Sequence, residues 1–216
     1  LGDVYKRQVL FCEDYLQKHP MKCVGGSLFT TEGRISDEES IRVDVHISLQ
    51  SDISMPLAIS ALQKQIKNTA DAKKYGDSIY GIEKKQFPYM LCITNLLLHG
   101  LDVPQVFHDN TLLHDVLDYT ERDQFDVILM NPPYGGSEKK DVKNHFPDDL
   151  ASSETADLFM SVIMYRLRPG GRAAVILPDG FLFGTDNAKV NIKKKLLSEF
   201  NLHTVIRMPG SVFAPY

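Results

Sequence analysis

Four consecutive residues, Asn131-Pro132-Pro133-Tyr134, combine groups that could hold a planar base. The Asn amide both accepts and donates hydrogen bonds. The two prolines have φ fixed near about −65° and no N–H group, so the backbone is stiff and its carbonyls remain available as acceptors. The Tyr ring offers a flat face for stacking. The tetrapeptide could therefore grip a molecule with an exocyclic amine, such as adenine, although a proline turn that ends a strand is common by itself.

Two further polar sites follow apolar, strand-like segments. Glu83 follows residues 79–82, and Asp109-Asn110 follows residues 105–108. A carboxylate such as Glu83 can accept hydrogen bonds from both ribose hydroxyls of a nucleoside cofactor. Asp109 could accept a bond from the amine of the cofactor's adenine, with Asn110 nearby. A surface acid and a turn cap, respectively, are the alternative interpretations.

These groups suit one reaction, which is methyl transfer from S-adenosyl-L-methionine to an adenine amine. The Asn131 side chain and the Pro132 carbonyl could both accept from the amine, which localises its lone pair for attack on the methyl group. No strong general base is needed, because the proton becomes acidic only after methylation. Orientation and electrostatics would carry the rate, and a base within a duplex would have to be flipped out.

Helix-like and strand-like segments alternate from about residue 55 onward. Helices are expected at residues 57–74, 87–98, 155–168 and 188–200, and strands at residues 78–83, 105–108, 125–130, 173–177 and 204–208. This spacing predicts an α/β fold with a doubly wound, mostly parallel sheet and helices on both faces. Ligands of such sheets bind beyond the carboxyl ends of the strands, where Glu83, Asp109 and Asn131 stand.

Several elements carry a more detailed expectation. Residues 173–177 are nearly all apolar, as in a strand covered on both faces. Residues 41–49 alternate apolar and polar, as in a strand exposed on one face. Residues 188–200 should present a basic outer face. Before the stop at Gly100, one helical face carries Phe87, Met90, Leu91, Thr94, Leu97 and Leu98.

Composition narrows the class of protein. The three cysteines, Cys12, Cys23 and Cys92, form no C-x-x-C pair, which argues against a disulfide framework or a zinc site and favours a reduced, cytoplasmic protein. We expect no metal ligands among the site residues. No stretch approaches the ~20 apolar residues of a membrane helix. The net charge of −4 is unfavourable for holding DNA alone, so another subunit should supply phosphate contacts.

Several segments together resemble, in family order, the modification (methylase) subunit of type I restriction-modification systems. The resemblance covers about residues 55–216. Its segments are residues 79–85, 87–100, 108–112, 126–136, 155–159, 169–180 and 210–216. It implies a fold like that of S-adenosylmethionine-dependent methyltransferases and methylation of the exocyclic amine of adenine in DNA. It also implies a separate specificity subunit that reads the DNA sequence, and a restriction subunit.

The resemblance gives each candidate residue a role. Glu83 would bind the ribose, and Asp109 with Asn110 would contact the cofactor's adenine. The catalytic loop would be Asn131, Pro132, Pro133 and Tyr134. Leu158 and Phe159 would line the cofactor pocket.

One departure from the family concerns its glycine-rich cofactor loop, Asp-Pro-Ala-Cys-Gly-Thr-Gly-Gly. That loop belongs just before the helix expected from Leu57, where this chain has Ser51 to Pro56, and no glycine occurs between Gly33 and Gly76. We therefore expect a methyltransferase catalytic domain at residues 55–216 that lacks this loop and a C-terminal part. Residues 1–54 remain unassigned and in part artefactual, since residues 3–8 resemble translated adapter sequence.

Two alternatives remain open at this point. A protein-glutamine methyltransferase could use the same tetrapeptide on a planar amide. A truncated, non-catalytic remnant of the DNA enzyme would keep the fold without the complete cofactor site.

Overall fold

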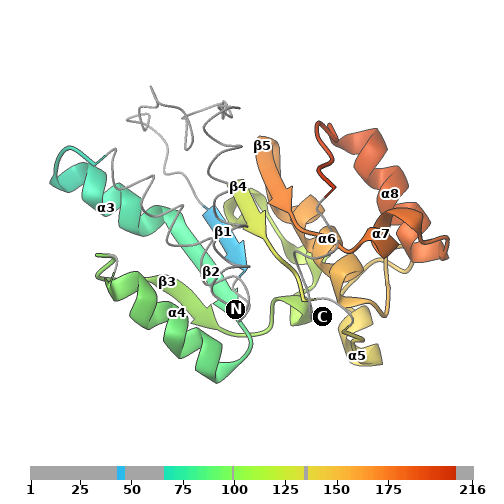
Figure 1. The fold of residues 1–216 in the computed structure, drawn as a ribbon, viewed down its shortest axis with the longest axis horizontal. Coiled ribbons are helices and arrows are strands. Elements are labelled where there is room, and N and C mark those ends of the chain that lie inside the picture. The colour runs from blue at the N-terminus through green and yellow to red at the C-terminus, as the bar shows by residue number, and fades with distance from the viewer. Residues whose placement is uncertain (1–42, 47–65, 99, 134–135, 208–216) are drawn as a thin grey trace.

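One parallel sheet organises the chain. The computed structural model describes residues 43–46, 66–98, 100–133 and 136–207. Within this part, the strand order is β3-β2-β1-β4-β5, and every neighbouring pair is parallel (Figure 1). The strands are β1 (Val43–His46), β2 (Ile79–Glu83), β3 (Gln105–His108), β4 (Phe125–Met130) and β5 (Leu167–Val175). The predicted doubly wound α/β class is confirmed.

The strand β1 lies at the centre of the sheet. It pairs with β2 on one edge and with β4 on the other. The chain therefore builds β2 and β3 outward on one side before it returns to place β4 on the opposite side. Such a reversal creates a crevice beside the carboxyl end of β1, where doubly wound sheets bind ligands. The sheet thus begins upstream of residue 55, where the sequence placed the start of the catalytic domain.

The helices cover the two faces of the sheet. They are α3 (Thr69–Ser78), α4 (Gln86–Leu98), α5 (Lys140–Lys143), α6 (Thr155–Arg166), α7 (Asp179–Phe183) and α8 (Asn187–Glu199). Short 3-10 turns lie at Thr111–Leu113, Val116–Asp118 and Glu121–Asp123. None of these described helices is both long and apolar enough to cross a membrane.

Alternate residues of β4 contribute side chains to two separate apolar cores, because successive strand residues point to opposite faces of the sheet. Val127 and Leu129 pack with the core of α3 and α4. Ile128 and Met130 pack with the core of α6 and α8. In Figure 1 these helix pairs lie on opposite sides of the sheet.

The helix that precedes β2 starts later than the sequence predicted. The predicted helix spanned residues 57–74, of which residues 57–65 lie outside the described part. The observed helix α3 begins at Thr69 because the Asn68 side chain accepts a hydrogen bond from the Asp71 backbone N–H at 2.8 Å. An amide cap of this kind fixes a helix start at that residue. The helix then continues past Lys74 to Ser78.

Helix α4 has the predicted extent but an unexpected orientation. Pro88, Cys92 and Leu96 face the core. The predicted apolar stripe is largely exposed, with Phe87 at 65% and Leu98 at 81%. The helix is apolar on both sides, so periodicity alone could not identify the buried face. Its stop at Gly100 is confirmed by a φ of 78°, which favours glycine.

The C-terminal half differs from the sequence expectations in three places. Helix α6 ends at Arg166, and β5 already begins at Leu167 and includes the Pro-Gly-Gly segment. Ala173 and Ala174 are exposed, because β5 is the edge strand of the described sheet and is not covered on both faces. The strand expected at 204–208 is absent from the described residues 201–207, which are exposed and irregular; residue 208 lies outside them.

Candidate active site

The strand register brings two candidate residues to one level of the sheet. His46, the last residue of β1, pairs with Ile82 on one side and with Met130 on the other. Glu83 and Asn131 are the next residues of their chains, so they flank the end of β1. Glu83 also pairs with His108, which places Asp109 one step beyond it on the neighbouring strand. The fold therefore gathers three candidates at one sheet edge.

Glu83 ends β2 as a buried acid. Glu83 is only 5% exposed, and its Oε1 accepts a hydrogen bond from the Lys85 backbone N–H at 2.7 Å. Its backbone carbonyl accepts from the Asp109 N–H at 3.2 Å. Burial of a carboxylate is unfavourable unless hydrogen-bond donors surround it. The predicted contact of Glu83 with ribose hydroxyls remains a prediction.

Asp109 is a half-exposed carboxylate with two neighbours. Its Oδ1 accepts from the Asn110 N–H at 2.7 Å, and its Oδ2 lies 2.8 Å from His114 Nε2. The Asn110 backbone bond, helped by His114, outweighs the opposing effect of burial and lowers the pKa of Asp109 below its ordinary value. The Asn110 side chain accepts from Leu112 N–H and so caps the following 3-10 turn.

The candidate catalytic tetrapeptide follows β4 directly. Asn131 is 8% exposed, Pro132 is buried and Pro133 is exposed. Tyr134 lies outside the described residues, so its predicted stacking role remains a prediction. The backbone continues the sheet at this point, because Ile176 N–H donates to the Met130 carbonyl at 3.0 Å. The site amide therefore sits on a rigid strand end.

The loop after the tetrapeptide is held against the start of α6. The Thr155 N–H donates to the Gly136 carbonyl at 3.1 Å, and the Glu138 N–H donates to the Ser153 carbonyl at 2.9 Å. Ser137 and Glu154 form an antiparallel bridge between these segments. A Cβ at Gly136 would lie 2.5 Å from Thr155 Oγ1, so only glycine fits without a shift.

The loop also approaches the end of β2. Lys84 Nζ lies 3.9 Å from Glu138 Oε2, which connects the candidate ribose side with the candidate base side. This long, partly exposed contact contributes little stability. The contact does show that the end of β2 and the loop after the tetrapeptide are neighbours.

Leu158 and Phe159 are core residues in this structure. Leu158 is 0% and Phe159 3% exposed, within the apolar core that α6 shares with β4. Their assignment to a cofactor pocket remains a prediction. No cluster of three or more His, Cys, Asp or Glu side chains in the described part could hold a metal ion.

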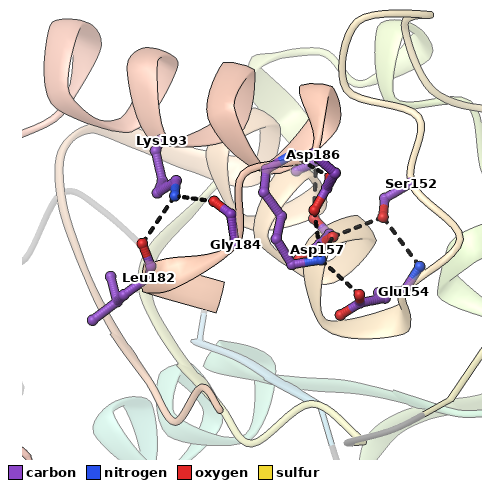
Figure 2. A network of polar contacts seen from close by, with 9 residues as sticks. Ser152, Glu154, Asp157, Leu182, Gly184, Asp186 and Lys193 are labelled. Atoms are coloured by element: carbon purple, nitrogen blue, oxygen red, sulfur yellow. Dashed lines mark hydrogen bonds and ion pairs between the residues drawn. The ribbon is translucent and has the colours of Figure 1, made fainter. Parts of the chain in front are cut away.

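Sequence reasoning missed a polar network beside the site. Lys189 of α8 lies among the carboxylates of Glu154, Asp157 and Asp186. Figure 2 shows these three acids together with Ser152, whose hydroxyl lies next to Asp157. Asp157 lies within residues 155–159, a segment that carried the family resemblance, but nothing local identified its partner. It is 32 residues from Lys189, so only the packing of α8 on α6 reveals the pair.

Comparison with protein families and known proteins gives a consistent result. Residues 54–216 match the family described as N-6 DNA Methylase. The methylase subunit of the Escherichia coli type I restriction enzyme EcoEI is 51% identical over 152 residues, which is 70% of this chain and 30% of that subunit. The chain therefore spans about a third of the length of this relative.

Solved structures give the same picture. A modification subunit, proposed for a type I restriction enzyme of Vibrio vulnificus YJ016, superposes with a TM-score of 0.75 at 41% identity. The match covers 81% of this chain and 38% of that one. A chain from a study of type I R-M system assembly has a TM-score of 0.74 at 32% identity, with coverages of 83% and 37%.

Proposed function

We propose that this chain, which belongs to the N-6 DNA methylase family, forms part of a DNA methyltransferase that modifies the exocyclic amine of adenine. The similarity to methylase subunits of type I restriction enzymes supports this proposal. The observation that carries it is the position of Asn131 and Pro132. They lie directly after β4 and beside the end of the central strand β1, where the sheet order reverses.

Asn131 and Pro132 would bind the target base. The Asn131 amide oxygen and the Pro132 carbonyl are two acceptors in consecutive residues, and each can accept one proton of an adenine amine. Two bonds from one amine turn its lone pair away from the ring. Because β4 and its continued pairing to Ile176 hold Asn131, this orientation is built in before the base arrives. Tyr134 would stack on the base.

The donor set fits the nucleoside half of S-adenosyl-L-methionine, which supplies the methyl group when bound. The Glu83 carboxylate suits the ribose hydroxyls, and Asp109 with Asn110 suits the adenine edge. Both carboxylates are acceptors, as those donors require. The methionine half would lie near residues that follow β1, which are outside the described part. Leu158 and Phe159 would line the cofactor pocket.

We also infer that the active enzyme is an assembly that acts on DNA. The proposed partners are a specificity subunit that reads the sequence and a restriction subunit of the same system. The net charge of −4 supports this division, since phosphate contacts dominate affinity for DNA. The DNA substrate implies a cytoplasmic location.

A protein-glutamine methyltransferase is the second candidate, because its planar amide could occupy the same acceptors. The relatives favour the DNA enzyme. A truncated, non-catalytic remnant is the third, and the missing glycines between Gly33 and Gly76 favour it.

The Asn131→Ala substitution tests the proposal in a complete methylase subunit assembled with its specificity subunit. Loss of one acceptor should lower single-turnover methylation of adenine by orders of magnitude, about the 10²–10³-fold seen when one preorganised polar group is removed. Cofactor affinity should change little. Normal methylation by the variant would contradict the assignment, and methylation of glutamine instead of DNA would favour the second candidate.

A further inference from the structure

A buried ion pair lies beside the segment that pairs with residues 136–138, which follow the candidate catalytic tetrapeptide. Lys189 Nζ contacts Asp157 Oδ2 at 3.0 Å, and the two side chains are only 5% and 1% exposed. Glu154 Oε1 at 2.7 Å and Asp186 Oδ2 at 3.2 Å contact the same ammonium from the solvent side (Figure 2). Burial opposes the charge of Lys189, but the bonds to Glu154, Asp157 and Asp186 outweigh it and raise its pKa. The lysine is therefore a cation throughout the neutral range.

The pair fixes the segment that precedes α6. Ser152 Oγ donates to the same Asp157 Oδ2 at 2.7 Å and accepts from the Glu154 N–H at 3.1 Å. Lys189 and Asp157 thus hold Ser152 and Glu154 from both sides. These contacts set where the chain lies as it enters helix α6.

That segment in turn holds the loop after the tetrapeptide. Residues 153–155 pair with residues 136–138 through two backbone hydrogen bonds and the bridge of Ser137 with Glu154. Gly136 stands three residues after Pro133. A continuous set of contacts therefore leads from Lys189 on α8 to the polypeptide that follows Asn131 and Pro132.

Stabilisation of the fold does not explain the ion pair of Lys189 with Asp157. Removing an ammonium and a carboxylate from water is costly, and apolar replacements of such pairs are often neutral or stabilising. Asp157 Oδ1 has no hydrogen-bond partner in the described part of the chain, which adds to that cost. What a directional pair supplies, and an apolar contact does not, is a fixed position for the groups around it.

We propose that Lys189 and Asp157 are positioning residues that fix residues 136–138, the loop that follows the candidate catalytic tetrapeptide, for methyl transfer. The catalytic half of this inference rests on the proposed function, whereas the effect on the loop does not. Lys189 and Asp157 touch neither substrate nor cofactor in this scheme. They act through Ser152, Glu154 and the paired residues 136–138.

Hydrogen exchange on the full chain tests the loop directly. The double variant Asp157→Leu/Lys189→Met removes both charges, so no unpaired buried charge remains and the domain should still fold. Peptides covering residues 136–138 and 152–155 should exchange faster by about tenfold or more, while peptides of β2 and β4 keep their protection. Lys195→Met, which removes the partly exposed pair with Glu199 on the same helix, is the matched control and should leave the loop unchanged.

Kinetics in the complete assembled subunit tests the catalytic half. The double variant should lower kcat while KM for the cofactor stays the same. The single variant Lys189→Arg, which keeps a cation beside Asp157, should have a higher kcat than the double variant. Unchanged exchange at residues 136–138, or an equal loss of protection in β2 and β4, would overturn the positioning of the loop. Altered loop exchange with normal kcat would overturn the catalytic role alone. If the proposed function is wrong, the unmodified enzyme will not methylate adenine, and the exchange result will still test the position of the loop.

Discussion

Glu83 and Asn131 stand at the same level of the sheet on opposite sides of β1, because each follows a residue that pairs with His46. Strands in a sheet lie ~4.8 Å apart, so two strand spacings separate their backbones by roughly 10 Å. The proposed ribose acid and the proposed base-binding amide are therefore neighbours across a single strand end. Each can be altered without direct contact with the other, which allows the two roles to be tested separately.

Glu83→Gln should weaken cofactor binding and spare the target base. A hydrogen bond to a charged group contributes about 1.5–3 kcal/mol, so affinity should fall roughly ten- to a hundredfold. Calorimetry of a complete methylase subunit with S-adenosyl-L-methionine measures the change, and Asn131→Ala is the control that should bind cofactor normally. Equal cofactor affinity in Glu83→Gln and the unmodified subunit would remove Glu83 from the site.

Gly136→Ala should disturb the loop through a single contact. The added Cβ would lie 2.5 Å from Thr155 Oγ1. Such overpacking lowers the free energy of unfolding by about 1–3 kcal/mol. Thr155→Ala removes the obstructing oxygen, so the double variant should be more stable than the sum of the two single changes predicts. Denaturant unfolding of all four proteins measures this coupling.

Gly76→Ala is the control for that cycle. A Cβ at Gly76, inside α3, meets nothing within 4 Å. Alanine in a helix interior is favoured over glycine by about 0.5–1 kcal/mol, so this variant should be more stable. If Gly136→Ala is equally stabilising, the close approach to Thr155 is not a constraint on the loop.

Asp109 should give the fold a dependence on acid pH. Its pKa is lowered from the ordinary value of 3.8, first by the Asn110 N–H and then by His114. A lowered pKa stabilises the folded state above pH 3.8 and loses that contribution as pH falls through the lower, folded value. Because the side chain is half exposed, solvent screening keeps the effect below about 1 kcal/mol.

The comparison is with Asp109→Asn, by denaturant unfolding between pH 7 and pH 2. The unmodified chain should be the more stable at neutral pH, and the difference should shrink toward the acid end. His114→Asn should lose only part of the difference, since the Asn110 bond remains. A difference that grows as pH falls would contradict the assigned direction.

The chain as given should bind S-adenosyl-L-methionine weakly or not at all. Close approach of the cofactor to the backbone needs residues without Cβ, and no glycine follows β1 before Gly76. Polar contacts at Glu83 and Asp109 cannot replace the contacts that the glycine-rich loop would make with the cofactor. Calorimetry should show no saturable heat at micromolar cofactor, and insertion of Asp-Pro-Ala-Cys-Gly-Thr-Gly-Gly ahead of Leu57 should restore it. A micromolar dissociation constant for the unmodified chain would show that the loop is dispensable.

Local pattern determined much of this protein. Strand-like runs that end in Glu83, His108 and Met130 identified β2, β3 and β4, and the polar residues at their ends identified the candidate site. These features are readable because strand preference, helix capping and the backbone limits of proline act over a few residues. The same short range explains why the strand ends could be named from the sequence while their distances could not.

Only the tertiary structure decided which segments meet. It placed Val43–His46 at the centre of the sheet, exposed the apolar stripe of α4, left β5 at an edge, and joined Lys189 to Asp157. Periodicity shows that a segment has an apolar face, but it does not say what covers that face. A parallel strand and a buried ion pair both take their partners from distant residues, so packing of the whole domain selects them.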